Sequence, residues 1–459
     1  MGLVVEEYPA QRLAEAATPA SLGMPRPTLK ARDVLAITVG IVVGAGIFRT
    51  PTLVAGVAGS DTAMLLAWTA GGLLSIIGAL CYAELASTYP SIGGDYHFLN
   101  RAYGAKVGFL YAWARLAVIQ TGSIALLAYV FGDYLAVLLP VGPHSAAIYA
   151  AAAVTLIGAI NWFGIRQTVQ AQRWLTVAEV GGLLFIVAAG LVLAPAAASS
   201  AAHQSQGAIG LMMVFVLLTY GGWSETVYVS AEIEGTPRRL RWIMVAGLAL
   251  VTLLYVLVNL AFLRVLGLAG MASSDAVAAD VMRSAIGSPA AVAIGLLVAA
   301  AALSSANATV ITGARTTCAL GRSVKSLRWI GIWDTNRNTP GNAVIVQSTV
   351  ALLLVIAGAF ARDGFQLAVE YTAPVFWLFM LLIGLSLFVL RVRDPGADRP
   401  VRVPLYPVLP SIFCITNSYL LYSSLAYTGA GAIAGVAVLA AGLLLLLFLR
   451  PMQTVDTGR

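Results

Sequence analysis

The chain has 459 residues, of which 59% are hydrophobic and only 10% are charged, whereas a soluble domain carries about 25% charged residues. So little charged surface excludes a soluble enzyme of this size, and the composition also excludes disordered, collagen-like and disulfide-framework proteins. An integral membrane protein remains, and the net charge of +7 has to be explained within that class.

Long apolar runs predict transmembrane helices, because a span needs roughly 20 mostly apolar residues. The runs are too long for barrel strands and do not alternate with period two. We predict an all-α membrane protein with about twelve helices. They cover 34–57, 63–88, 107–139, 145–164, 174–195, 208–233, 240–264, 287–320, 342–360, 367–392, 408–427 and 431–449.

The polar segment 1–33 has no pattern of a cleaved signal peptide, so we expect a cytoplasmic N-terminal tail. The basic residues support this orientation. Twenty-one lysines and arginines fall in the two tails and the connections on the same side, against three on the other: Arg264, Arg283 and Arg362. By the positive-inside rule, both termini, including the tail 450–459, are predicted to be cytoplasmic. This placement explains the positive charge and indicates no nucleic-acid partner.

Two predicted helices contain glycines in mid-span. The first reads G-I-V-V-G-A-G-I-F over 40–48, and the sixth reads Y-G-G-W over 220–223. They open two five-span halves, 34–195 and 208–392, and the helices within 408–449 follow. Interrupted helices at corresponding positions of two halves are typical of a transporter site at the bilayer midplane. Five spans per half require the second copy to be inverted.

A helix broken inside the membrane exposes N–H groups at one new end and C=O groups at the other. The N–H end attracts a carboxylate, and the C=O end attracts an ammonium group or a metal cation. An α-amino acid carries both charged groups and fits such a pair of ends. The alternative is that the glycines only allow close packing of helices.

The chain resembles the amino acid–polyamine–organocation superfamily of secondary transporters, most closely its amino acid permeases, over residues 34 to about 392. The matching stretches are G-A-G-I-F at 44–48, Y-A-E-L at 82–85 with G-G-D-Y at 93–96, Y-G-G-W at 220–223, and the stretches 307–315 and 337–340. The resemblance implies a leucine-transporter-like fold, with two inverted five-helix repeats and alternating access.

The resemblance also implies a substrate site. The backbone amides of Ala45, Gly46 and Ile47, beside Gly44, would bind the substrate carboxylate. The carbonyls of Ile41, Leu218, Thr219 and Gly221, beside Gly222, would bind the ammonium group. Trp223 would lie just past the second break.

Two positions depart from the family pattern. Leu218 stands where exchangers of large neutral amino acids tend to have Phe, and Glu179 stands where many relatives have a lysine in the fifth helix. We expect Glu179 to serve ion coupling, either by loading a proton or by binding sodium together with Ser304 or Ser305, because hard cations prefer oxygen ligands. A structural pairing of Glu179 with an arginine or a hydroxyl group is the alternative.

Charged residues inside spans suggest function with a partner. Arg49 and Glu225 lie just past the two breaks and could flank one cavity, or form a structural ion pair. Arg115 and Glu370 are expected to extend to the membrane interface. Glu84 and Glu232 are expected to fix cytoplasmic loops.

These observations predict a secondary active transporter of amino acids in the cytoplasmic membrane, acting by alternating access as a proton symporter. It needs no cofactor and no resident metal, and its partners are the amino acid, a coupling ion and the bilayer. Sodium symport, amino acid exchange, and polyamine or other organocation transport stay open. A channel would need a continuous polar lining, and a membrane-embedded enzyme would need a catalytic motif. We find neither in the sequence and expect no enzyme.

Overall fold

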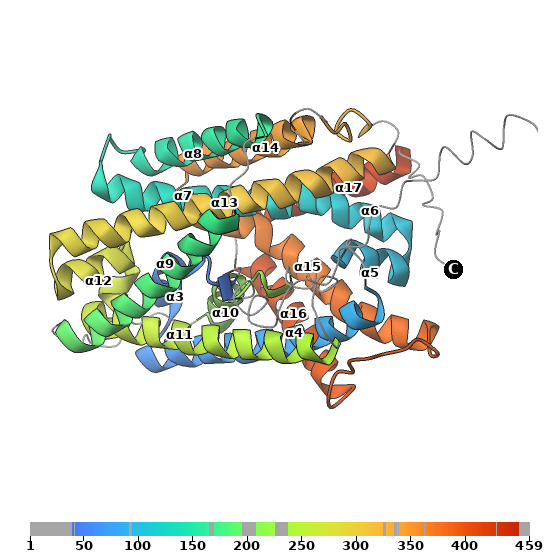
Figure 1. Cartoon of the computed structure of the whole chain (residues 1–459), viewed down its shortest axis with the longest axis horizontal. Helices are drawn as coiled ribbons and strands as arrows, with labels where there is room; N and C mark the ends of the chain where they lie inside the picture. Colours follow the sequence, from blue (N-terminus) through green and yellow to red (C-terminus); the bar gives the residue numbers. More distant parts are fainter. Residues whose placement is uncertain are drawn as a thin grey trace, which may run out of the picture.

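The computed structural model is helical throughout the part of the chain that it describes (Figure 1). That part comprises residues 39–40, 42–90, 94–164, 169–194, 208–224, 237–324, 327–334, 337, 339–361, 363–427 and 429–448. Within it, nine helices are long and apolar enough to cross a membrane. The predicted class, an all-helical membrane protein, is therefore confirmed.

The elements follow one another along the chain in a fixed order. They are η1 (Ala45–Phe48), α3 (Thr50–Val57), α4 (Asp61–Thr88), α5 (Gly94–Tyr103), α6 (Ala105–Ala114), η2 (Arg115–Ile119), α7 (Gln120–Leu138), α8 (Ser145–Trp162), α9 (Val169–Ala188), η3 (Ala189–Leu193), α10 (Ile209–Thr219), α11 (Pro237–Ala272), α12 (Val277–Ala285), α13 (Ser288–Ser323), α14 (Gly341–Ala359), α15 (Gly364–Arg393), α16 (Val408–Ala426) and α17 (Ala430–Phe448). The helices α6 and α7 continue through the π-turn η2 and form one span of 34 residues.

The predicted spans differ from the observed helices where the sequence contains glycine. Within the described residues, the first predicted span is interrupted before the short helices η1 and α3, and the helix α10 of the sixth span ends after 11 residues. The helix α11 extends beyond its predicted end, but Gly267 interrupts it with a φ of 65°. A positive φ costs glycine little, so the chain can turn there.

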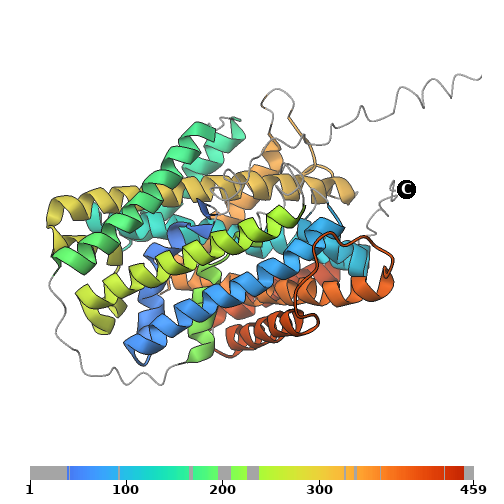
Figure 2. The same ribbon diagram turned by 60° about the horizontal axis from the view of Figure 1, so that its bottom comes forward.

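The helices pack in two groups. In the first, α4 lies along α11 (Figure 2), α3 packs against α11 and α10, and α10 packs against α4. In the second, α7 packs against α8, α13 and α14. The approach in the first group is close, because a Cβ added to Gly72 of α4 would overlap the side chain of Thr252 on α11. The helix α15 contacts α7, α16 and α17, and also α4.

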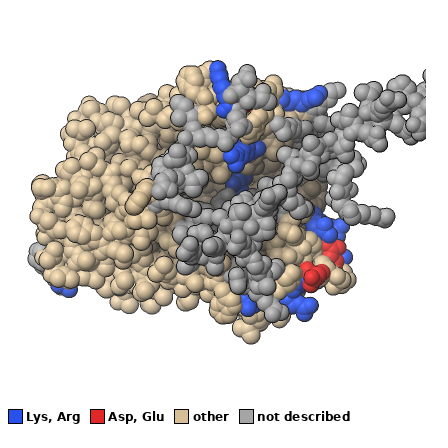
Figure 3. Space-filling model, in the orientation of Figure 1, with Lys and Arg blue, Asp and Glu red and all other residues tan. Residues whose placement is uncertain are grey.

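The two ends of the molecule differ in charge. We name them the α12 end and the α5 end, after the short helices that lie there (Figure 1). Figure 3 shows Lys and Arg side chains mainly over the half that contains α5, while the half that contains α12 is mostly uncharged. The basic side chains that the sequence predicts on one side of the membrane therefore lie mainly at one end of the fold.

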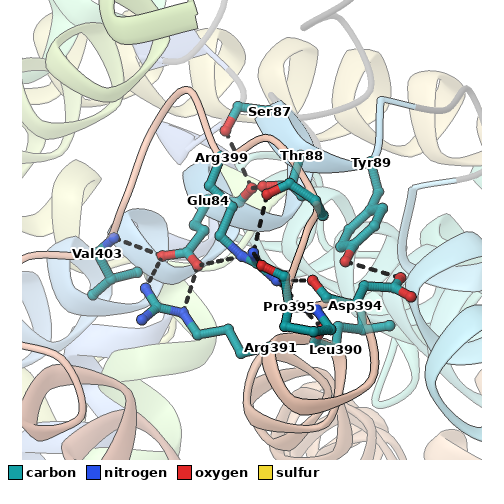
Figure 4. Close-up of polar contacts among 11 residues, drawn as sticks. Glu84, Ser87, Thr88, Tyr89, Leu390, Arg391, Asp394, Pro395, Arg399 and Val403 are labelled. Atoms are coloured by element: carbon teal, nitrogen blue, oxygen red, sulfur yellow. Dashed lines mark hydrogen bonds and ion pairs between the residues drawn. The ribbon is translucent and has the colours of Figure 1, made fainter.

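Glu84 holds the α5 end together (Figure 4). Its carboxylate accepts hydrogen bonds from Nε and Nη2 of Arg391, at 2.7 and 2.6 Å, and from the backbone N–H of Val403, at 2.7 Å. Arg399 lies 3.7 Å away. The expectation that Glu84 fixes a loop is confirmed, since these partners lie at the end of α15 and in the following connection. Glu232 lies outside the described residues.

A second contact in Figure 4 lies beside this cluster. Tyr89 donates a hydrogen bond to Asp394 at 3.2 Å, and Arg101 of α5 donates to the same carboxylate at 2.9 Å. The hydrogen bond and the positive charge of Arg101 hold the pKa of Asp394 below its usual range. Asp394 therefore stays ionised at neutral pH and connects α5 to the end of α15.

We predict that Glu84→Ala destabilises the protein strongly. Glu84 is 2% exposed, and its removal leaves the Arg391 guanidinium without its acceptor. Breaking a buried ion pair by removing one partner costs about 3–5 kcal/mol. Unfolding of the purified protein in detergent measures this loss. The control is Arg283→Ala, which removes an exposed pair with Asp280 and should cost under about 1 kcal/mol. Equal stability of the two variants would contradict this role of Glu84.

Candidate functional site

The first helix is broken where its glycines cluster. Helical structure ends near Val42, and Gly44 is extended, with φ −92° and ψ 179°. The turn η1 follows, and α3 begins at Thr50 with Pro51 in its first turn. Glycine is a weak helix former, and proline is tolerated at a helix start because it lacks the N–H that would be unpaired there. Among the described residues, no side chain caps η1.

The second break follows α10. This helix ends at Thr219, and the N–H of Gly221 donates to the carbonyl of Leu218 at 3.0 Å. Gly222 has a φ of 94°, a left-handed conformation that favours glycine over any other residue. The sequence Y-G-G-W therefore turns the chain out of the helix, as predicted.

The two breaks lie against each other. A Cβ added to Gly46 would meet Cγ2 of Thr219 at 3.6 Å. Ala45 and Ile47 are fully buried, and Thr219 is 8% exposed. The structure therefore brings the first-break residues Ala45, Gly46 and Ile47 close to the end of α10, in the interior of the helix assembly. Ile41 lies outside the described residues.

Two tyrosines, to which the sequence analysis assigned no role, support the breaks. Tyr255 of α11 donates a hydrogen bond to the carbonyl of Val42 at 2.8 Å, and Tyr220 donates to the carbonyl of Trp68 at 2.9 Å. Their ring centroids are 5.1 Å apart. Backbone groups at a helix break inside a membrane need hydrogen-bond partners. Tyr255 provides one for the Val42 carbonyl at the end of the first helix.

Trp223 lies just past the second break, as the resemblance implies. Its ring packs edge to face against Tyr82, with centroids 5.0 Å apart, and lies 6.4 Å from Phe413. A cavity of about 20 Å³ adjoins Trp223 and Gly221. Trp223 therefore connects the second break to α4 and α16.

Glu179 is 3% exposed on α9. Thr176, one turn earlier, lies so close to the first helix that a Cβ on Gly40 would be 2.7 Å from its Cγ2. The Tyr255 hydroxyl that donates to the Val42 carbonyl lies near Glu179. Within the described part of the chain, its carboxyl group has no hydrogen-bond partner. The structure therefore places Glu179 beside the first break.

The two serines predicted for ion coupling lie on α13, which contacts both η1 and α9. Ser304 is 4% exposed, and Ser305 is half-buried. The carbonyl of Ser305 accepts a hydrogen bond from Thr309 at 2.8 Å. Ser304 and Ser305 therefore belong to a helix that borders the first break.

Arg49 has two acidic partners that the sequence analysis did not identify. Its Nε lies 3.0 Å from a carboxylate oxygen of Asp133, and its Nη2 lies 2.6 Å from one of Asp363. Arg49 is thus ion-paired, and its partners are not the residue that the sequence suggested. Glu225, its suggested neighbour, lies outside the described residues.

Arg115 contradicts its prediction. It is 6% exposed, lies within the long span at the start of η2, and donates a hydrogen bond to the Tyr111 hydroxyl at 3.1 Å. That hydroxyl donates in turn to Asp95 at 2.9 Å. The expectation that Arg115 extends to the interface is therefore wrong, because the buried Tyr111 provides a polar partner inside the fold. Glu370 is half-buried and accepts a hydrogen bond from Gln366.

Comparison with known proteins gives matches over most of the chain. The family model described as "Amino acid permease" matches residues 29–448. The b(0,+)-type amino acid transporter 1 of Homo sapiens is 30% identical over 397 residues, which cover 84% of this chain and 80% of that protein.

Two further relatives carry names of the same kind. The cystine/glutamate transporter of Homo sapiens is 26% identical over 86% of this chain and 81% of its own length. The large neutral amino acids transporter small subunit 2 of Homo sapiens is 28% identical over 85% and 74%. The family match covers nearly the whole chain, including both helix breaks, and the chain therefore belongs to the amino acid permease family.

Proposed function

We propose that this amino acid permease is a secondary active transporter that binds its substrate between the two helix breaks and moves it by alternating access. The observation that carries the proposal is the contact between the breaks, where Gly46 lies against Thr219. Two broken helices that meet inside a membrane protein offer N–H and C=O ends to one small solute.

The residues have separate tasks in this proposal. The amides of Ala45, Gly46 and Ile47 bind the substrate carboxylate, helped by the positive end of the helix dipole. The carbonyls of Ile41, Thr219 and Gly221 bind the ammonium group, together with the free lone pair of the Leu218 carbonyl. Gly44 and Gly222 give the backbone its shape, and Trp223 closes one side.

Two inverted repeats, 34–195 and 208–392, would account for the helix pairing. The second spans of the two halves, α4 and α11, pack together, as do the third spans, α7 and α13, and the fourth spans, α8 and α14. The excess of basic residues at the α5 end favours a cytoplasmic position for that end and for both termini. The membrane would be the inner, cytoplasmic membrane of the cell.

Glu179 is our candidate for proton coupling. A buried carboxylate without a partner is expensive, so the group favours the neutral form unless a cation is present. Its position beside the first break would let proton release follow the movement of that helix. Sodium binding with Ser304 or Ser305 is the alternative within symport.

Amino acid exchange is a second candidate function. It is favoured by the relative whose name couples two amino acids, the cystine/glutamate transporter. An exchanger needs no net ion movement, so it would not require Glu179 to change its protonation state.

We predict that the substrate carboxylate is essential for binding. The decarboxylated amine of the best amino acid substrate should compete at least about tenfold more weakly than the parent, because it lacks the group that the first-break amides bind. Competition for labelled uptake by purified protein in liposomes measures this. Equal competition by amines would reject the amino acid site and favour organocation transport.

A further inference from the structure

The helices α8 and α14 form an open groove on the second helix group. They pack side by side along one edge of the molecule (Figure 1). The groove has a volume of about 250 Å³, and its lining runs from Val154 to Trp162 on α8 and from Val344 to Leu352 on α14. Neither helix break contributes to this lining, so the proposed substrate site does not account for the groove.

The groove faces the bilayer. Both of its helices are long and apolar enough to cross a membrane. Thr155 and Ala159 in its wall are exposed, and the neighbouring side chains of Leu156 and Leu353 are 55% and 61% exposed. Exposed leucines on transmembrane helices are covered by lipid, so lipid is also what meets the groove.

The length of the groove matches one leaflet of the membrane. One end lies at Trp162, the last residue of α8, and at Val344, near the start of α14. From this end, which we call the mouth, the lining continues for about 12 Å along each helix, because a helix rises roughly 1.5 Å per residue. Half of the hydrocarbon core is about 15 Å thick. The groove therefore extends through most of the acyl-chain region of one leaflet.

An arginine lies at the mouth. The guanidinium of Arg337 lies 4.1 Å from the ring centroid of Trp162 and 6.0 Å from that of Phe163, and stacking on these rings holds it in place. Its Nε lies 3.7 Å from a carboxylate oxygen of Asp334, which is beyond hydrogen-bond distance. The Arg337 side chain is 39% exposed, so its N–H donors are accessible to a further anion.

Aromatic side chains place the mouth at the membrane interface. Trp329 and Ile332, in the connection before α14, are 52% and 58% exposed. The carbonyl of Trp329 accepts a hydrogen bond from Asn342, in the first turn of α14, at 2.7 Å, so this connection is fixed beside the groove. Tryptophan is enriched at membrane interfaces because its ring is apolar and its N–H is polar. Arg337 therefore lies at the level of the lipid head groups.

We propose that the groove binds an anionic phospholipid, with one acyl chain between α8 and α14 and its phosphate on Arg337. Arginine binds phosphate through a planar fork of donors, and basic pockets between transmembrane helices attract anionic head groups on the cytoplasmic side. The proposed orientation puts the mouth on that side, so the lipid comes from the cytoplasmic leaflet. This site goes beyond the proposed transport of amino acids and does not depend on it.

Lipid binding to the purified protein measures the site directly. The protein in detergent is titrated with phosphatidylglycerol or with phosphatidylcholine of the same acyl chains, and native mass spectrometry gives the dissociation constant of the first bound lipid. We expect phosphatidylglycerol to bind at least about fivefold more tightly, because one arginine at the surface attracts the anionic head group. Equal affinities for the two lipids would overturn the proposal.

Arg337→Gln should lower the affinity for phosphatidylglycerol to that for phosphatidylcholine. Arg337→Lys should keep most of the preference, because lysine retains the positive charge but lacks the planar fork. The matched control is Arg402→Gln, which neutralises an exposed arginine between α15 and α16 and should keep the full preference. A preference of Arg337→Gln within twofold of this control would contradict the head-group contact.

Ala159→Trp should fill the groove and weaken the binding of both lipids. Ala159 is exposed, so the fold accommodates the larger side chain. Ala152→Trp makes the same change at an exposed position two turns earlier on α8, outside the groove lining, and should bind lipid normally. Equal lipid binding by these two variants would reject the groove as the acyl-chain site. A dimer that Ala159→Trp dissociates would assign the groove to a second copy of the chain and would also reject the lipid. The assay involves no transport, so its result is separate from that of the uptake experiments.

Discussion

Gly46→Leu is expected to reduce amino acid uptake to the level of protein-free liposomes while the protein still folds and inserts. A Cβ at this position meets Thr219 at 3.6 Å, which is ordinary contact, so the fold tolerates the first carbon. The rest of a leucine side chain would fill the space between the breaks and block the approach of substrate to the amides of Ala45–Ile47. Uptake of labelled substrate by reconstituted protein measures the loss.

Gly46→Ala and Gly181→Leu separate blockage from misfolding. Alanine at 46 should retain a large part of the uptake, since its methyl group fits without a clash. Gly181 lies on α9, and a Cβ there meets nothing within 4 Å, so a leucine at 181 should leave uptake near normal. Normal uptake by Gly46→Leu would mean that the glycines only serve helix packing.

Glu179→Gln is expected to remove the dependence of uptake on an imposed pH gradient. Glutamine keeps the size and polarity of the side chain, but it cannot load or release a proton. The first break and the space beside Thr219 are not altered by the change, so exchange of internal for external substrate should survive. The measurement compares accumulation with and without a pH gradient against counterflow in the same liposomes.

Other outcomes of this experiment favour other mechanisms. If Glu179→Gln instead removes the stimulation of uptake by sodium, Glu179 belongs to a cation site. Ser304→Ala and Ser305→Ala would then be expected to weaken sodium binding at that site. Unchanged dependence on both gradients would mean that Glu179 is not the coupling residue. If the wild-type protein exchanges amino acids but never accumulates them, exchange is its mode of transport.

The features that could be predicted from the sequence are local ones. The clustered glycines of 40–46 and the dipeptide Gly221-Gly222 weaken a helix wherever they occur, so both breaks were foreseen. The apolar length of the spans follows from membrane thickness. Glu84, a carboxylate where α4 ends, also indicated a loop contact, although the sequence did not identify Arg391 as its partner.

The features that could not be predicted depend on contacts between distant segments. Arg49 and Asp363 are 314 residues apart, and neither has a neighbour in sequence that indicates the other. Tyr255 is one of several tyrosines in apolar spans until folding brings its hydroxyl to Val42. The contact of Arg115 with Tyr111 is local, one turn along the predicted helix 107–139, but the fold alone brings Asp95 to that Tyr111 hydroxyl.

The most direct test of the central claim is uptake by the purified protein in liposomes, measured with a panel of labelled amino acids under imposed pH and sodium gradients. The account predicts saturable entry of at least one amino acid, driven by a gradient or by internal amino acid and absent from the Gly46→Leu protein. If no amino acid enters above protein-free liposomes, although the protein is folded and correctly inserted, the proposed function is wrong.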